Sequence, residues 1–185
     1  MRATYLTGDC IYLRGLVDTD KDHAMAWMPG QFLANAPKAE AYFKEKVKFG
    51  ERNRYLVICR RETDEIVGGL SLWMDSRHGY VRFKVAPWCD DAGLIRADAL
   101  RILVPWLRDE ADLVNTNFDI AADDREAIAA AEELGLVLAV RLREWIARPG
   151  HRVDQLSYQA VNPRWVPVQM QGQTSTSEKQ EASNA

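Results

Sequence analysis

The sequence of 185 residues lacks the features that mark secreted and membrane-spanning proteins. Its three cysteines, Cys10, Cys59 and Cys89, are odd in number and widely spaced, which argues against a disulfide framework and favours reduced thiols. No run reaches the roughly 18 apolar residues of a membrane-spanning helix, and the first residues lack the apolar centre of a signal peptide. We therefore expect a soluble cytoplasmic protein with no membrane partner.

An excess of positive charge is also missing. The 24 Lys and Arg residues are outnumbered by 27 Asp and Glu, a formal net charge of −3, which argues against a nucleic-acid partner. The three histidines, His23, His78 and His151, have no ligand spacing with each other or with cysteine, so no metal site is predicted. Neither a Gly-x-Ser-x-Gly motif nor a Walker phosphate loop occurs.

The composition that is present, 47% hydrophobic and 28% charged, is typical of a globular protein of one domain. We assign residues 1–167 to this domain and expect a disordered polar tail at 168–185, because that segment has almost no apolar residues. The hydrophobic periodicity predicts the order β-α-α-β-β-β-α-β-α-β-β. The strands are expected at 11–14, 54–60, 66–74, 80–85, 113–120, 137–146 and 152–161, and the helices at 18–28, 35–50, from 95 onward and at 124–134.

Several local expectations follow from turn and helix-end residues. Pro29-Gly30 is expected to end the first helix. Asn35 is predicted to begin the second helix and Gly50 to end it. The apolar stripe of this second helix is formed by Ala39, Phe43 and Val47. The run "RYLVICR" predicts a strand buried on both faces. Pro105 lies inside the third helical pattern, so we expect a kink or an early end there.

The segment from residue 121 to 146 predicts a helix tied closely to a strand. Asp123 as N-cap would place Glu126 at the third helical position, the arrangement of a capping box. Gly135 is placed to take the left-handed conformation that ends a helix. The following strand alternates, and one side is expected to carry Leu138, Val140, Leu142 and Ile146.

This segment, "DDREAIAAAEELGLVLAVRLREWI", with Arg141, Arg143, Gly150 and Asp154, resembles the GNAT superfamily of acyl-CoA-dependent N-acyltransferases, especially RimJ/RimL-like N-acetyltransferases. The opening "YLRGLVDTDKDHAMAWM" is similar to the first strand and helix of that family, and the resemblance covers roughly Ile11 to Val161. It implies one α/β domain with a mixed, mostly antiparallel sheet flanked by helices. It also implies that the protein transfers an acyl group from acyl-CoA to an amine by direct attack.

The resemblance further implies a site for acetyl-CoA as co-substrate. In the family, backbone amides of a glycine-containing loop that opens a helix bind the diphosphate, and here that loop follows "VAP". Asp124 stands where the family usually has an Asn that bonds the pantetheine arm. The cofactor-binding residues that the resemblance implies are Val85, Gly93, Leu94, Ile95, Arg96 and Asp124.

The loop departs from the family pattern. Asp90 and Asp91 bring negative charge towards a diphosphate, Arg96 is expected to offset part of it, and Ile95 crowds a position usually held by a small residue. Shifting the alignment by one residue would match Asp98 to an acid that RimL-like proteins often carry, but Gly93 then matches no required position. We prefer the ungapped alignment.

The catalytic residues remain open. The family's Tyr, often proposed to protonate the leaving thiolate, is replaced by Ala131, which has no proton to give. A general base must remove the proton of the ammonium acceptor, and Asp119, Asp124 and His78 are the candidates. Arg82 and Lys84, on the polar side of the strand that carries Val81, Phe83 and Val85, would favour an acceptor with a carboxylate or phosphate; alternatively they pair with acids such as Asp119.

A second function stays open beside the acyltransferase. The acidic loop, Ala131 and the polar tail are also compatible with a catalytically inactive member of the same fold that serves as a binding or assembly module. The acceptor is an amine of unspecified identity, a protein N-terminus or a small molecule. A homodimer is an open alternative to a monomer.

Overall fold

The computed structural model describes residues 6–27, 35–42, 44–45 and 53–165. One eight-stranded sheet has the order β1-β2-β3-β4-β5-β6-β8-β7, and only the β5–β6 pair is parallel. The predicted α/β class and element order are confirmed, with β1 as an additional strand. The strands are β1 (Leu6–Thr7), β2 (Ile11–Gly15), β3 (Asn53–Arg60), β4 (Ile66–Asp75), β5 (His78–Val85), β6 (Asn115–Ala121), β7 (Val137–Arg148) and β8 (His151–Val161).

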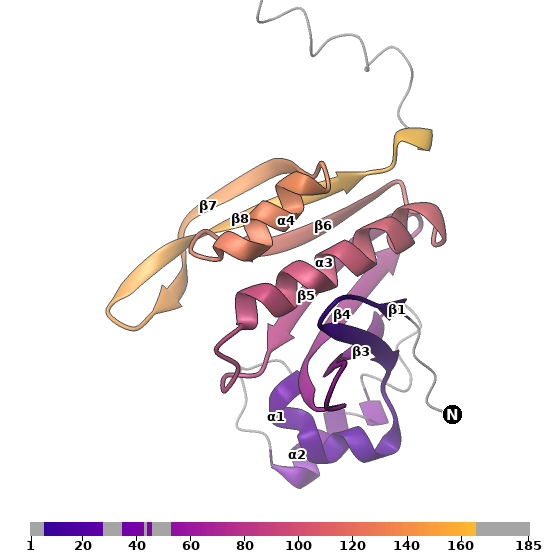
Figure 1. The fold of residues 1–185 in the computed structure, drawn as a ribbon, viewed down its shortest axis with the longest axis vertical. Helices are drawn as coiled ribbons and strands as arrows, with labels where there is room; N and C mark the ends of the chain where they lie inside the picture. Colours follow the sequence, from indigo (N-terminus) through magenta and orange to yellow (C-terminus); the bar gives the residue numbers. More distant parts are fainter. Residues whose placement is uncertain (1–5, 28–34, 43, 46–52, 166–185) are drawn as a thin grey trace, which may run out of the picture.

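Two helices, α3 (Ala92–Asp109) and α4 (Arg125–Glu133), lie side by side on one face of the sheet (Figure 1). Their apolar sides and the sheet enclose the main core, in which Val81, Phe118, Leu100 and Leu103 are almost completely buried. Because side chains alternate along a strand, the residues between these core positions face the other side of the sheet. That second face carries the polar residues of β5 and β6.

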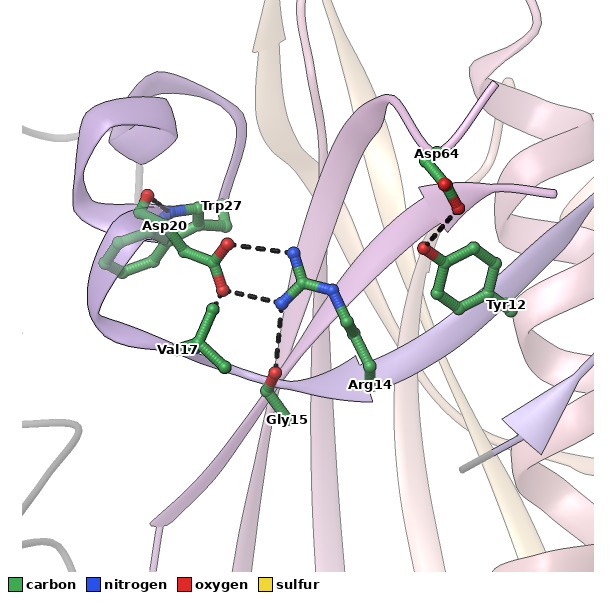
Figure 2. A network of polar contacts seen from close by, with 7 residues as sticks. All are labelled: Tyr12, Arg14, Gly15, Val17, Asp20, Trp27 and Asp64. Carbon is green, nitrogen blue, oxygen red and sulfur yellow. Dashed lines mark hydrogen bonds and ion pairs between the residues drawn. The ribbon is translucent and has the colours of Figure 1, made fainter. Parts of the chain in front are cut away.

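The second face is partly covered by the 3-10 helix η1 (Asp18–His23) and by α1 (Ala24–Trp27), with α2 (Ala36–Tyr42) beyond them. Figure 2 shows the contacts that hold them: Asp20 accepts two hydrogen bonds from Arg14, at 2.7 and 2.8 Å, and one from the Val17 amide at 2.8 Å. The Trp27 indole donates to the Asp20 carbonyl at 2.7 Å. A Cβ on Gly69 would lie 2.6 Å from Trp27 Cβ, so only glycine lets α1 approach β4 this closely.

Several local predictions are confirmed. Asn35 accepts a hydrogen bond from the Lys38 amide at 2.9 Å and so caps α2. Gly135 has a φ of +73° and ends α4 in the left-handed conformation. Val57, Ile58 and Cys59 of β3 are completely buried although they point to opposite faces of the sheet.

Three local predictions are wrong. The early end expected at Pro105 does not occur, since α3 continues to Asp109 with Leu103 and Leu107 on either side held in the main core, and the alternative of a kink stays a prediction. The cap of α4 is Asp124, which accepts from the Ala127 amide at 3.3 Å, and Asp123 instead bonds Arg148 at 2.8 and 3.0 Å. Glu126 is therefore not part of a capping box with Asp123.

The third error concerns β7. This strand is the edge of the sheet, its hairpin with β8 extends beyond the helices (Figure 1), and among the described residues no helix covers its apolar side chains. Leu138 and Val140 are 46% and 49% exposed. Irregular pairing between Leu138 and Val140, and between Leu142 and Ile146, also breaks the alternation on which the prediction depended.

Other predictions fall on residues outside the described part, namely Pro29, Gly30, Phe43, Val47, Gly50 and the tail at 168–185. Among the described helices, none is both long and apolar enough to cross a bilayer.

A buried carboxylate fastens the N-terminal hairpin to α3. Asp98 accepts hydrogen bonds from the backbone amides of Cys10, Ile11 and Asp9, at 2.8, 3.0 and 3.1 Å. Burial by itself raises the pKa of Asp98, but these hydrogen bonds outweigh it, and the pKa of Asp98 lies below its ordinary value. Burial, with hydrogen bonding to Asp98 second, raises the pKa of the Cys10 thiol to about 11, so Cys10 stays protonated at neutral pH. The acid aligned with RimL-like proteins thus has a structural role here.

We predict that Asp98→Asn lowers the free energy of unfolding by about 2 kcal/mol at pH 7, because charge-assisted hydrogen bonds to three amides are weakened. A depressed folded-state pKa contributes stability that is present above the unfolded pKa and lost as the pH falls through the folded value. Urea denaturation should therefore show the difference shrinking below about pH 4. An equal difference at pH 7 and pH 3 would contradict this role.

Candidate active site

The parallel pairing between β5 and β6 is short. It runs over four residue pairs, from His78 with Asn115 to Val81 with Phe118. Beyond Val81 and Phe118 both strands continue, to Val85 and Ala121, but no longer pair with each other. Their other edges stay paired, β5 with β4 and β6 with β8. The two strands therefore part within the sheet, and residues 82–85 of β5 are not paired with β6.

The start of α3 follows directly after this unpaired edge. The first backbone bond of the helix joins the Ile95 amide to the Asp91 carbonyl at 3.1 Å, and Asp91 makes no side-chain cap. Within the described part of the chain, the amides of residues 92–94 have no acceptor, the arrangement that favours an anion. Gly93 and Leu94 lie here, as the family resemblance implies. We expected Ile95 to crowd the loop, but its side chain is completely buried in the main core and therefore does not crowd the solvent side of the loop.

One of the two acids of this loop, Asp91, has a cationic partner, but not the predicted one, and Asp90 has none among the described residues. Arg60, at the end of β3, binds Asp91 through two hydrogen bonds of 2.7 Å each. Arg96 instead bonds the buried carboxylate of Asp124, so it does not offset Asp90 and Asp91. Sequence analysis missed Arg60, because no spacing in the sequence relates it to a residue 31 positions later.

A second acid near the loop, Glu126, also has no partner among the described residues. A Cβ built on Gly93 would lie 2.5 Å from Glu126 Oε2 and 3.1 Å from Asp124 Oδ1, so both side chains cover Gly93. Asp124 is paired with Arg96, whereas Glu126 has no hydrogen-bonding or ionic partner among the described residues. Since Glu126 lies in the first turn of α4 and is exposed, its carboxylate can move away from Gly93.

A polar group lies on the second face where the strands part. Arg82 and Asp119 are the residues that follow the last pair, Val81 and Phe118, one on each strand. They are joined by Tyr80, whose hydroxyl donates to Asp119 Oδ2 and accepts from Arg82 Nε at 3.1 Å. The Arg82 guanidinium also lies 5.0 Å from the centre of the Tyr80 ring. The structure thus brings together a carboxylate, a phenol and a guanidinium.

The charge states of this group follow from its contacts. Burial, with the hydrogen bond to Asp119 second, raises the pKa of the Tyr80 phenol, so Tyr80 is a neutral donor at neutral pH. The hydrogen bond to Tyr80 raises the pKa of Arg82. Lys84 lies two residues further along the same face, and burial lowers its pKa. The sequence left open that Arg82 pairs with Asp119. In the described residues the two make no direct ion pair, and the Tyr80 hydroxyl links them instead.

The other predicted residues lie elsewhere. His78 is at the opposite end of the β5–β6 pairing, four residues or about 13 Å along the strand from Arg82, and it bonds Asn115 at 2.8 Å. Ala131 is completely buried in the main core. Tyr80 was not among the candidates, although its place on the polar side of "YVRFKV" was the available signal.

Comparisons with known proteins give the family. No family model matches the sequence, and no curated protein matches it. Among solved structures, a "putative acetyltransferase" from Sphaerobacter thermophilus DSM 20745 is 45% identical, with a TM-score of 0.72 over 87% of this chain and 99% of that one. The chain belongs to the GNAT superfamily of N-acyltransferases.

More distant members share the fold of this GNAT chain. The spermidine/spermine N-acetyltransferase SpeG from Vibrio cholerae is 16% identical, with a TM-score of 0.64 over 84% of this chain and 95% of that one. The ribosomal-protein-S5-alanine acetyltransferase from Vibrio fischeri is 14% identical, with a TM-score of 0.66 over 90% and 100%. In the GNAT chain itself, the family residues Arg141 and Asp154 bond each other at 2.6 Å and hold the β7–β8 hairpin. No group of three possible metal ligands occurs in the described residues.

The adjacent acids Asp123 and Asp124 provide a matched pair of variants. We predict that Asp124→Asn lowers the free energy of unfolding by about 2 kcal/mol, because it leaves the partly buried Arg96 without its counter-ion. Asp123→Asn breaks the more exposed pair with Arg148 and should cost about 0.5 kcal/mol or less. Both losses in the free energy of unfolding can be measured by urea denaturation at pH 7. Equal losses would contradict the difference in burial.

Proposed function

We propose that this GNAT chain transfers an acyl group from acyl-CoA to a primary amine. The observation that carries the proposal is the end of the β5–β6 pairing at Val81 and Phe118, followed directly by the free amides of α3. Together they present an extended backbone edge and an anion site in one continuous stretch. We keep the cytoplasm as the expected location, where the three thiols would stay reduced.

The residues present fit an acyl-CoA. The part of β5 beyond Val81 that no longer pairs with β6 can bond the amides of a pantetheine arm, and the amides of residues 92–94 can bond a diphosphate. Arg60 and Arg96 neutralise Asp91 and Asp124, and among the described residues Asp90 and Glu126 stay unpaired; Glu126 covers Gly93 directly. When bound, acyl-CoA supplies the acyl group as an activated thioester.

Asp119 is positioned to take the proton of the acceptor. Its Oδ2 is held by the Tyr80 hydroxyl, and its Oδ1 has no partner among the described residues. Removing a proton from the ammonium group gives the amine lone pair that forms the bond to the acyl carbon while the carbon–sulfur bond breaks, and the nitrogen then loses a second proton to solvent to become the neutral amide. Since Ala131 has no proton to give, the thiolate, which leaves with the electron pair of that bond, is protonated by solvent.

The relatives support an amine as acceptor, since one of them acts on spermidine or spermine and another on the alanine of a ribosomal protein.

The alternative of an inactive binding module is favoured by two observations. Glu126 covers Gly93, and the position of the usual acid is the buried Ala131. The two functions can be distinguished by measuring whether the protein binds acetyl-CoA and whether it forms an acylated amine.

The first test is thermal melting with acetyl-CoA. At a hundred times Kd, binding should add about 2.7 kcal/mol and raise Tm by roughly 5–10 °C. Glu126→Gln should tighten binding about threefold, because the negative charge that covers Gly93, the proposed diphosphate position, is removed.

Glu133→Gln is the matched control. It removes the same charge from the last turn of the same helix, where Glu133 bonds the exposed Arg101 at 2.8 Å, and should leave Kd unchanged. The absence of any Tm shift with acetyl-CoA would contradict the proposed function. An unchanged Kd in Glu126→Gln would contradict the placement of the diphosphate at Gly93.

The second test concerns the base. We predict that Asp119→Asn lowers kcat by about 100-fold or more while Kd for acetyl-CoA is unchanged, because the carboxylate acts on the ammonium proton and lies outside the diphosphate site. Acylated product is measured by mass spectrometry over a panel of amines. His78→Asn is made in parallel; a large loss in this variant and none in Asp119→Asn would assign the base to His78 instead.

A further inference from the structure

We infer that the acceptor of this enzyme is a zwitterion, a primary amine with an anionic group on a neighbouring carbon, as in free amino acids. The inference rests on the proposed acyl transfer and adds the class of the acceptor. It depends on the arrangement of Arg82, Tyr80 and Asp119 on the second face of the sheet.

The first observation is that the two charged groups of opposite sign flank the same point. Arg82 and Asp119 come directly after the last β5–β6 pair, so both lie where the acyl group would be presented between the parting strands. One hydroxyl, that of Tyr80, bonds both of them, which keeps the guanidinium and the carboxylate within about 6 Å of each other. The group is therefore a fixed pair of charges at the proposed reaction centre.

The second observation is that Arg82 and Asp119 each have side-chain atoms that can still form hydrogen bonds with a ligand. Only Nε of Arg82 is used, and its two terminal nitrogens have no partner among the described residues. Asp119 likewise uses only Oδ2. Arg82 is also exposed, so the available nitrogens are accessible to a ligand.

These two groups match the two ends of an amino acid. A guanidinium binds a carboxylate through two parallel hydrogen bonds, and a carboxylate accepts a hydrogen bond from an ammonium group. In a free amino acid the two charges are separated by a single carbon, so both can contact the pair of Arg82 and Asp119 together. The contact with Asp119 also places the ammonium proton on the proposed base.

The same charges disfavour other amines. A polyamine such as spermidine has no anion for Arg82 and brings further positive charge towards Arg82 and Lys84. The terminal amine of a peptide has an amide, not a carboxylate, on the neighbouring carbon. Arg82 would then gain no anionic partner from either acceptor.

The experiment compares matched acceptors with the full-length chain and acetyl-CoA. The probes are an equimolar mixture of the twenty free amino acids, the same mixture as C-terminal amides, and spermidine, with products identified by mass spectrometry. O-phosphoethanolamine and ethanolamine form a second matched pair, which distinguishes a phosphate from a carboxylate as the anion. We expect at least one free amino acid or O-phosphoethanolamine to be acetylated roughly tenfold or more faster than its uncharged counterpart.

Arg82→Gln should abolish most of this preference. The value of kcat/KM for the anionic acceptor should fall about tenfold or more, while that for its amide or for ethanolamine should change little. Kd for acetyl-CoA should remain the same, which shows that the variant is folded. Arg77→Gln is the control, because Arg77 loses the same charge in the β4–β5 turn, where it pairs with Asp112 at 3.8 Å.

Two results would overturn the inference alone. One is a wild-type enzyme that acetylates spermidine or the amides as fast as the anionic acceptors. The other is a preference that persists unchanged in Arg82→Gln. Failure of the proposed function gives a different result, in which no amine of the panel is acetylated by the wild-type enzyme, and this would overturn both.

Discussion

The end of the parallel pairing between β5 and β6 is the constraint on which the rest of the site depends. Each strand has a partner on its other edge, so the sheet remains intact while the two strands part after Val81 and Phe118. Beyond Val81, β5 therefore no longer pairs with β6 although it lies in the middle of the sheet. The same separation places Arg82 and Asp119 on the opposite face, so the proposed acyl donor and acceptor meet at one point.

Paired charges keep the elements around this point in place. Asp20 with Arg14 fixes η1 and α1 on the second face, and Asp98 with three amides fixes the β1–β2 hairpin on α3. At the loop, Arg60 and Arg96 each bind an aspartate from a different element. An acidic loop can thus have much less negative charge in the folded protein than its sequence indicates.

The strands and helices of the core were predictable because their apolar residues repeat with the period of the element. The prediction failed for β7, where irregular pairing with β8 breaks the alternation that the sequence indicates. The early end expected at Pro105 does not occur, because burial of the helix sides compensates for one lost hydrogen bond. Asp123 and Asp124 are equally suitable caps by residue type, and only the position of Arg148 and Arg96 distinguishes them.

The sequence by itself determined the order of the elements, the superfamily, and the two faces of β5, because local periodicity and short motifs are contained in neighbouring residues. The tertiary structure alone decided which charges meet. Arg60 and Asp91, Arg96 and Asp124, and Tyr80 and Asp119 are between 28 and 39 residues apart. Hydrogen bonds act over about 3 Å, so such pairs become visible only when the strands and helices have been placed beside each other.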